Sequence, residues 1–294
     1  MKKKALILGA SGQVGQALIK ELEGRGWGWE GSFFEHREVS SKLFKLDLGD
    51  LSSVRREVFA RKPQAVFLPS GWTWVDGCEA DPERAMLVNA RAPEMAAEAA
   101  AHLNIPLVYY STEYVFGENG GPYDELRAPQ PLGAYGASKL AGEERVRQAW
   151  GGALILRTTV VYGPEPQGKN FVYQLIKQLK AGLPMPVPED QISSPTYNAD
   201  LAKASLDLVE RDLNGIWNVA GSSTMDRAAF ARLAARSFGL DAGLIQGVKT
   251  ASLNQKAKRP LQAGLSIEKL QKTLGWTPLS AEDGLRRMAE ALKA

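Results

Sequence analysis

The first half of the chain alternates short apolar runs with longer stretches in which apolar residues recur at helical spacing. The short runs predict strands at residues 5–8, 27–34, 65–68, 106–110 and 153–156. The longer stretches predict helices at residues 14–22, 51–61, 82–103 and 135–150. Apolar strands separated by helices of this length favour a parallel sheet with helices on both faces. The predicted fold class is therefore α/β, with a doubly wound parallel sheet.

The pattern changes after about residue 160, where prolines interrupt shorter elements. Helices are expected near residues 199–210 and 227–238, and a final helix is expected at residues 281–292. A late apolar run at residues 216–219 predicts a strand that returns to the main sheet. We therefore expect a sheet domain at residues 1–160 and a smaller, less regular C-terminal lobe at residues 161–294, with some elements of the lobe returning to the sheet.

The composition of the chain excludes several classes of protein and site. Lys and Arg number 36 against 33 Asp and Glu, and this net charge of +3 gives no basis for nucleic-acid binding. With one cysteine, Cys78, and two histidines, His36 and His102, no disulfide framework and no cysteine-rich or multi-histidine metal site is expected. The first apolar run is too short for a signal peptide, and no run reaches the roughly 20 apolar residues of a membrane helix. We expect a cytoplasmic protein without a metal, nucleic-acid or membrane partner.

A glycine-rich turn with the spacing G-x-x-G-x-x-G lies between the first predicted strand and the first predicted helix. Its residues are Gly9, Ala10, Ser11, Gly12, Gln13, Val14 and Gly15. Glycines at such positions permit a tight turn, close approach of a pyrophosphate and close packing of helix on strand. The N–H groups at the start of the helix attract phosphate. The turn therefore predicts that residues 1–160 form a Rossmann-type dinucleotide-binding domain.

The residues after the second predicted strand bear on which dinucleotide binds. Glu35 lies 20 residues after the last glycine of the turn, where a carboxylate can hold the ribose 2′-hydroxyl of NAD. His36 and Arg37 follow and can instead hold the 2′-phosphate of NADP. The alternative is that all three belong to an ordinary solvated loop. Two groups that can carry positive charge against one acid favour NADP over NAD, and we expect Asp47 and Leu48 to line the adenine pocket.

A tyrosine and a lysine four residues apart, Tyr135 and Lys139, begin one predicted helix and share one of its faces. A free tyrosine has a pKa of about 10, and a neighbouring ammonium together with an oxidised nicotinamide is expected to lower this pKa. Thr112 closes the fourth predicted strand, at the edge where open parallel sheets bind ligands. Its hydroxyl and that of Tyr135 can stabilise the oxyanion that develops on a carbonyl as hydride arrives. The alternative is a Ser-Thr turn beside an ordinary amphipathic helix.

Together these motifs resemble the extended short-chain dehydrogenase/reductase superfamily. Within it the chain is most similar to the dTDP-4-dehydrorhamnose reductase family and its relatives, which include the regulatory beta subunit of methionine adenosyltransferase. The resemblance covers nearly the whole chain. Besides the motifs above, it rests on residues 75–79, 82–83, 88–89, 111–116, 156–158, 161–164, 170–171, 190–191, 194–196, 200–202 and 259–260.

The resemblance implies a role for each matching residue. It implies that Tyr135 is the proton donor, that Lys139 is its partner and holds the nicotinamide ribose, and that Thr112 orients the carbonyl. It places the rest of the cofactor against Leu68, Pro69, Ser70, Gly71, Asn89 and the loop at Tyr162 and Gly163. It makes residues 161–294 a substrate-binding lobe, and the implied contacts of a nucleotide sugar are Val75, Thr112, Tyr114, Val160, Asn170 and Thr196.

The chain departs from the family pattern mainly near the substrate. Glu113 stands where the reductases usually carry aspartate, and Val160 stands where they usually carry tryptophan. The acidic pair of the sugar-nucleotide dehydratases is absent because Glu113 and Tyr114 fill those places, which argues against dehydration.

The resemblance thus implies an NADP-dependent reductase of the 4-keto group of a sugar nucleotide. Two alternatives stay open: a sugar-nucleotide epimerase that holds its nicotinamide cofactor, and an NADP-binding regulatory subunit of a partner enzyme. The expected partners are the nucleotide sugar and, as an alternative to a monomer, a second copy in a homodimer.

Overall fold

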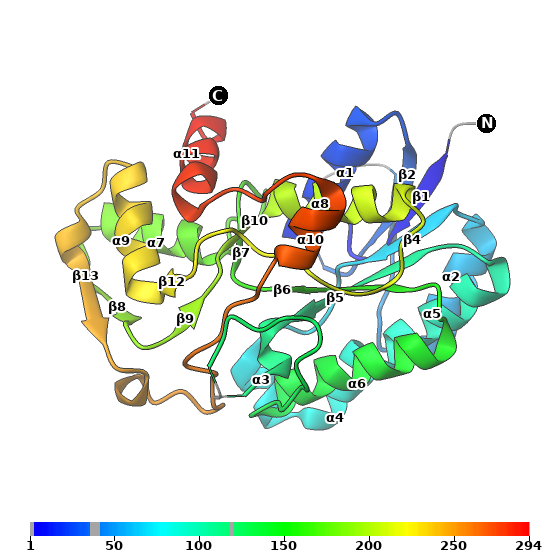
Figure 1. Cartoon of the computed structure of the whole chain (residues 1–294), viewed down its shortest axis with the longest axis horizontal. Helices are drawn as coiled ribbons and strands as arrows, with labels where there is room; N and C mark the ends of the chain where they lie inside the picture. The colour runs from blue at the N-terminus through cyan, green and yellow to red at the C-terminus, as the bar shows by residue number, and fades with distance from the viewer. Residues whose placement is uncertain (1–2, 36–41, 118–119, 294) are drawn as a thin grey trace.

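The computed structural model describes residues 3–35, 42–117 and 120–293, and a parallel β-sheet forms its centre (Figure 1). Within these residues the main sheet has seven strands in the order β11-β6-β5-β4-β1-β2-β3, and each neighbouring pair is parallel. The strands are β1 (Lys4–Ile7), β2 (Gly28–Phe33), β3 (Leu43–Lys45), β4 (Ala65–Leu68), β5 (Leu107–Thr112), β6 (Leu154–Thr158) and β11 (Gly215–Asn218). The predicted α/β fold class is confirmed, and so is the late strand that returns to the sheet, because β11 pairs with β6.

Both faces of the sheet are covered by helices. Helices α1 (Gln13–Gly24) and α8 (Asn198–Glu210) cover one face, and α2 (Leu51–Arg61), α5 (Ala92–Leu103) and α6 (Ala134–Ala149) cover the other. Successive residues of a strand point to opposite faces, so Ala5 and Ile7 of β1 join the first core, whereas Leu6 joins the second. A strand buried on both faces is apolar throughout, which is why uninterrupted apolar runs predicted these strands well.

The strand order reverses between β1 and β4. The chain builds β2 and β3 outward on one side of β1, and then places β4, β5 and β6 in turn on the other side. The segments that follow β1 and β4 therefore meet at the carboxyl edge of the sheet. Ser70 ties them together, because its backbone N–H and its hydroxyl both donate to the Leu8 carbonyl, at 3.2 and 2.7 Å. Open α/β sheets bind their ligands at such a reversal.

The helix predicted at residues 82–103 differs from the structure in one respect. It consists of α4 (Pro82–Met86), a π-helical turn (Leu87–Arg91) and α5. The wider turn contains Asn89, whose side chain bonds to the loop after β4. A helical pattern of apolar residues does not distinguish such a local change in pitch, which recurs at functional sites.

The remaining elements form a smaller group beside the sheet, on the left in Figure 1. Helices α7 (Phe171–Lys180), α9 (Arg227–Ser237) and α11 (Ala281–Ala291) pack around a separate apolar core that includes Phe230, Leu285 and Met288. The short strands here pair as β7 (Val161–Tyr162) with β10 (Thr196–Tyr197), β8 (Met185–Pro188) with β13 (Ile245–Val248), and β9 (Ile192–Ser193) with β12 (Met225–Asp226). Helices α3 (Val75–Ala80), α7 and α10 (Glu268–Leu274) were not predicted from the sequence. None of the helices in the described part of the chain is long and apolar enough to cross a membrane.

Candidate active site

The glycine turn after β1 has no room for a side chain at Gly9 or at Gly15. Gly9 has a φ of +107°, and a Cβ on it would lie 2.6 Å from the Ser70 Cβ. A Cβ on Gly15 would lie 2.3 Å from the Gly9 carbonyl oxygen. The tight turn and the close packing of helix on strand that the glycine spacing predicted are both present.

The N-terminus of α1 faces this turn and is open. Its N-cap is Gly12, which has no side chain to accept from the first N–H groups. The Nε2 of Gln13 is buried and has no hydrogen-bond partner among the described residues. Gln167 reaches across from the segment between β7 and α7 and donates to the Ser11 carbonyl at 2.9 Å. A backbone cradle, free N–H groups and an unpartnered amide nitrogen fit the pyrophosphate of a dinucleotide.

The residues expected at the adenosine end are only partly described. Glu35 is exposed, whereas His36 and Arg37 lie outside the described residues, so the choice between NADP and NAD stays a prediction. Asp47 is exposed and accepts from the Gly49 N–H at 2.8 Å, and Leu48 is half-buried.

The loop after β4 is held by Asn89. The amide oxygen of Asn89 accepts from the Trp72 N–H at 2.8 Å, and its nitrogen donates to the Trp72 carbonyl at 3.0 Å and to the Ser138 hydroxyl at 3.1 Å. A Cβ on Gly71 would lie 3.0 Å from the amide oxygen of Asn89 and 3.9 Å from Nζ of Lys139. Leu68, at the end of β4, is fully buried, and Pro69 to Gly71 are half-buried. The loop therefore brings the predicted nicotinamide residues next to the predicted catalytic lysine.

Lys139 is buried against the sheet. Its ammonium donates to the Tyr110 carbonyl at 2.5 Å and lies 4.1 Å from the centre of the Tyr109 ring. Burial lowers the pKa of Lys139 to about 7, although the carboxylate of Glu143 opposes this shift. Glu143 is itself ion-paired with the buried Arg157 at 2.6 Å. The lysine is therefore close to its point of titration near neutral pH.

Tyr135 and Thr112 meet at the mouth of this region, as their predicted roles require. Burial raises the pKa of Tyr135 above 10.0, and hydrogen bonding by the Thr112 side chain opposes this shift. The Thr112 oxygen also accepts from the Tyr114 N–H at 3.2 Å, and the Tyr114 ring packs edge-on against Tyr135 with ring centres 5.4 Å apart. The lowered tyrosine pKa that we expect from the lysine ammonium together with an oxidised nicotinamide stays a prediction, and burial acts in the opposite direction. A neutral phenol is the form that can donate a proton.

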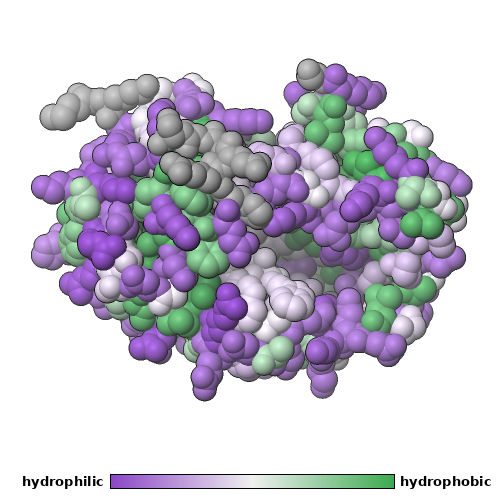
Figure 2. Space-filling model, turned by 180° about the vertical axis from the view of Figure 1, so that it is seen from behind, coloured by the Kyte–Doolittle hydropathy of each residue, from purple (hydrophilic) through white to green (hydrophobic). Residues whose placement is uncertain are grey.

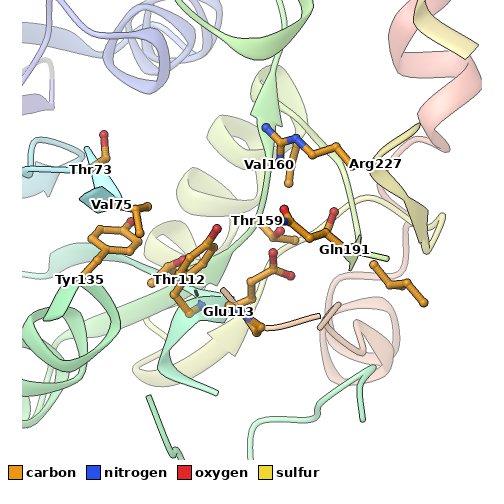
Figure 3. A pocket seen from close by; sticks show the side chains of 13 residues that line it. Thr73, Val75, Thr112, Glu113, Tyr135, Thr159, Val160, Gln191 and Arg227 are labelled. Carbon is orange, nitrogen blue, oxygen red and sulfur yellow. Dashed lines mark hydrogen bonds between the residues drawn. The ribbon is translucent and has the colours of Figure 1, made fainter. Parts of the chain in front are cut away.

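A cavity of about 270 Å³ opens beside Tyr135 and Thr112. Thr73, Val75, Glu113 and Tyr114 line it together with these two residues on the side of the sheet domain (Figure 3). Thr159 and Val160, which follow β6, also line it, and Gln191, Ile192, Ser193, Arg227 and Pro260 line it from residues 161–294. The face of the molecule opposite to that of Figure 1 is also hollowed near its centre (Figure 2). The described residues contain no group of three or more His, Cys, Asp and Glu placed to hold a metal ion.

The predicted substrate contacts divide into two groups. Val75, Thr112, Tyr114 and Val160 line the cavity. Asn170 instead caps α7 by accepting from the Val172 N–H at 3.1 Å, and it donates to the Gly163 carbonyl at 2.9 Å. Thr196 is fully buried and donates to the Ser194 carbonyl at 3.0 Å. The structure therefore gives the last two residues local hydrogen bonds rather than a place on the cavity wall.

Val160 has an unusual backbone conformation. Its φ is +39°, in the left-handed region that favours glycine, and it is β-branched. Such strain persists where surrounding structure enforces it, and it is concentrated at functional sites. Val160 lies on the cavity wall, at the position where the reductases that this chain resembles usually carry tryptophan.

Sequence reasoning missed Glu113 and Arg227 as site residues. The Glu113 carboxylate is buried and accepts from the Gly264 N–H at 3.0 Å, and burial raises its pKa to about 7 despite the positive charge of Arg227. Arg227 begins α9 and lines the cavity from the opposite side. The substitution of glutamate for aspartate at position 113 was a usable signal, whereas nothing in the sequence near Arg227 indicated which cavity it would reach.

Comparison with known proteins gives a consistent result. The family described as RmlD substrate binding domain matches residues 3–294. The probable low-salt glycan biosynthesis reductase Agl14 of Haloferax volcanii is 32% identical over 292 residues, which cover 98% of this chain and 97% of that protein. The dTDP-4-dehydrorhamnose reductase of Sinorhizobium fredii is 32% identical over 257 residues, 84% of this chain and 86% of that protein. The crystal structure of dTDP-4-dehydrorhamnose reductase from Bacillus anthracis in complex with NADP matches with a TM-score of 0.89 at 30% identity, over 100% of both chains.

Proposed function

Because the chain belongs to the dTDP-4-dehydrorhamnose reductase family, the family of the RmlD substrate binding domain, we propose that it reduces the 4-keto group of a 6-deoxy sugar nucleotide with NADPH. At the level of reaction class the chain is an NAD(P)-dependent oxidoreductase of this family. The observation that carries the proposal is that Thr112 and Tyr135 line the cavity, while Lys139, one turn further along α6, has its ammonium beside Gly71 of the loop after β4.

The reduced nicotinamide supplies the hydride when it is bound. Thr112 and Tyr135 both donate to the substrate carbonyl oxygen and stabilise the negative charge that develops there. Tyr135 then passes its phenolic proton to this oxygen, and its raised pKa keeps the proton available at neutral pH. Lys139 supplies positive charge beside the resulting phenolate and a donor for the nicotinamide ribose, since its ammonium faces the Gly71 turn.

We infer that the two parts of the chain have the different functions that the family resemblance implies. Residues 1–160 hold the dinucleotide and one wall of the cavity, and residues 161–294 form the substrate-binding lobe that closes the cavity with Gln191, Ile192, Ser193, Arg227 and Pro260. Helix α8 and strand β11 of this second part belong to the main sheet. NADP is the preferred cofactor in this proposal, supported by the NADP in the Bacillus anthracis structure and by His36 and Arg37 in the sequence. Replacing both residues with alanine should weaken NADPH binding about tenfold or more and NADH binding little, since a charge-assisted bond to phosphate is lost.

The substrate carrier is proposed to be dTDP. The similarity to the dTDP-4-dehydrorhamnose reductase of Sinorhizobium fredii supports this assignment. Valine at position 160 counts against it, because it removes an aromatic surface that the reductases usually carry. A panel of dTDP-, UDP- and GDP-linked 4-keto sugars, with simple ketones as controls, should therefore give its highest kcat/KM with the dTDP sugar.

The test of the reaction is NADPH consumption with that panel, in the wild type and in Tyr135→Phe. We expect the phenylalanine variant to lose kcat by about 10²-fold or more and to keep its affinity for NADPH. Near-normal turnover in this variant would refute the assignment of Tyr135. Conversion of the sugar without net NADPH consumption would identify an epimerase. Binding of NADPH with no turnover, together with a stoichiometric partner enzyme, would identify a regulatory subunit.

A further inference from the structure

The cavity contains a cation that lacks an anionic partner. The backbone N–H of Arg227 donates to the Gln191 carbonyl at 3.0 Å, which fixes this residue at the cavity wall. Its guanidinium carbon lies 4.5 Å from the centre of the Phe171 ring. Within the described part of the chain, no carboxylate forms an ion pair with this guanidinium and no acceptor receives a hydrogen bond from it. Figure 3 shows the side chain extending toward Val160, over the cavity.

Asp226, which precedes Arg227 in the chain, and Glu113, on the opposite side of the cavity, do not neutralise this charge. Asp226 caps α9, because its carboxylate accepts from the Ala229 N–H at 2.8 Å. The Glu113 carboxylate interacts with the guanidinium electrostatically but forms no ion pair with it among the described residues, and it accepts from the Gly264 N–H at 3.0 Å. Its pKa of about 7 leaves it partly protonated at neutral pH, so it offsets only part of the positive charge of Arg227.

A second arginine adds to the positive charge but has its own partners. Arg259 donates to the Asp76 carboxylate at 3.0 Å and to the Ala257 carbonyl at 2.6 Å. Burial and the positive charge of Arg259 both lower the pKa of Arg227. Burying a cation without a counter-ion costs free energy, and a ligand anion would recover it. Arg227 is therefore the group at the cavity with donors to spare.

We propose that Arg227 binds the diphosphate of the substrate and so selects a nucleoside diphosphate sugar over a free ketone. This assignment rests on the proposed function, to which it adds the residue that recognises the carrier. A planar guanidinium with free donors matches phosphate oxygens, which accept paired hydrogen bonds from it. Its contact with Phe171 holds the plane of the guanidinium in place without using its donors.

The size of the cavity agrees with this assignment. A volume of about 270 Å³ lies just below the range of roughly 300–1,000 Å³ for small-molecule sites, so the cavity holds a sugar and its phosphates rather than a whole nucleotide sugar. The sugar keto group then lies at Thr112 and Tyr135, the diphosphate lies at Arg227, and the base lies outside the cavity.

The experiment measures binding to protein saturated with NADPH, which keeps the dinucleotide site filled. The probes are dTDP, UDP and GDP, each compared with its nucleoside by calorimetry. Arg227→Gln should weaken diphosphate binding about tenfold or more and leave nucleoside binding within about twofold. Arg227→Lys should recover part of the loss because it restores the charge without the planar fork. The matched control is Arg236→Gln, an exposed arginine on the same helix, which should behave as wild type.

Two results would overturn the assignment: wild-type protein that binds no nucleoside diphosphate, or an Arg227→Gln variant whose nucleoside and diphosphate affinities change alike. These results are separable from failure of the proposed function. Protein that binds dTDP through Arg227 but turns over no keto-sugar nucleotide keeps this inference and refutes the function. Protein that reduces a keto-sugar nucleotide with the same KM in Arg227→Gln keeps the function and refutes this inference.

Discussion

The side-chain amide of Asn89 pairs with both backbone groups of Trp72, accepting from its N–H at 2.8 Å and donating to its carbonyl at 3.0 Å. A single buried side chain thus takes the place of a neighbouring strand for the loop that follows β4. The same amide donates to the Ser138 hydroxyl at 3.1 Å, on the helix that carries Tyr135 and Lys139. One residue therefore positions both the loop after β4 and the helix that carries Tyr135 and Lys139.

We expect Asn89→Ala to loosen this loop. It leaves the Trp72 N–H without its partner, which should cost about 1–3 kcal/mol of stability. The KM for NADPH should rise more than the KM for the ketone, because the loop lies on the cofactor side of the site. Asn89→Asp keeps the acceptor for the Trp72 N–H but places a buried carboxylate oxygen against the Trp72 carbonyl, so it should destabilise at least as much as the alanine variant. Thermal unfolding and steady-state kinetics measure both effects, and an unchanged KM for NADPH in Asn89→Ala would contradict the positioning role.

The glycine turn offers a second prediction with a control in the same helix. An alanine Cβ at position 15 would lie 2.3 Å from the Gly9 carbonyl oxygen and 2.7 Å from the Ala10 Cα, and backbone atoms cannot move aside cheaply. Gly15→Ala should therefore destabilise the fold and abolish NADPH binding. A Cβ at Gly24, in the last turn of α1, meets nothing within 4 Å. Gly24→Ala should be neutral or stabilise by about 0.5–1 kcal/mol. Equal effects of the two substitutions would show that the crowding at Gly15 is unimportant.

The sequence predicted those features that depend on local pattern. The apolar runs predicted the main strands because these strands are buried on both faces. The glycine spacing predicted a tight turn with close packing of helix on strand, and the structure has no room for a side chain at Gly9 or Gly15. The four-residue spacing of Tyr135 and Lys139 placed both on one helix face, and both are buried at the carboxyl edge of the sheet.

The features that the sequence did not predict depend on distant contacts. Arg227 lies more than a hundred residues after Thr112 in the sequence. It lines the same cavity only because α9 begins beside the end of β9. Asn170 matched the family motif for a substrate contact, yet its side chain caps a helix. The raised pKa of Tyr135 depends on burial, which a spacing of residues does not specify.

The pH dependence of stability provides a test of the burial of Lys139. Its pKa falls from 10.5 to about 7 on folding because burial disfavours the ammonium. The unfolded chain then binds more protons than the folded chain between these values, so the contribution of Lys139 to stability rises with pH across this window. It is present above pH 10.5 and is lost as the pH falls through about 7.

We therefore expect Lys139→Met to gain stability relative to wild type most strongly below pH 7 and to lose this advantage toward pH 10. Denaturant unfolding at several pH values measures the difference. Lys20→Met removes an exposed lysine on α1 and should give a difference that does not vary with pH. A flat pH profile for Lys139→Met as well would mean that its ammonium is not desolvated.

Glu113 should give a pH dependence of the opposite sign. Burial raises its pKa from 4.5 to about 7, and the groups that oppose this shift are the Thr159 hydroxyl, the Gly264 N–H and the charge of Arg227. The folded chain binds more protons than the unfolded chain between these values, so the contribution of Glu113 to stability is full below pH 4.5 and is lost as the pH rises through about 7.

Glu113→Gln keeps the shape and an acceptor for the Gly264 N–H but does not titrate. Its stability relative to wild type should therefore increase from pH 4.5 to pH 7 and then level off. Glu144→Gln, at an exposed site on α6, is the matched control and should show no such increase. A Glu113→Gln variant that loses stability relative to wild type as the pH rises would instead mean that the carboxylate is held ionised, with Arg227 as its permanent partner.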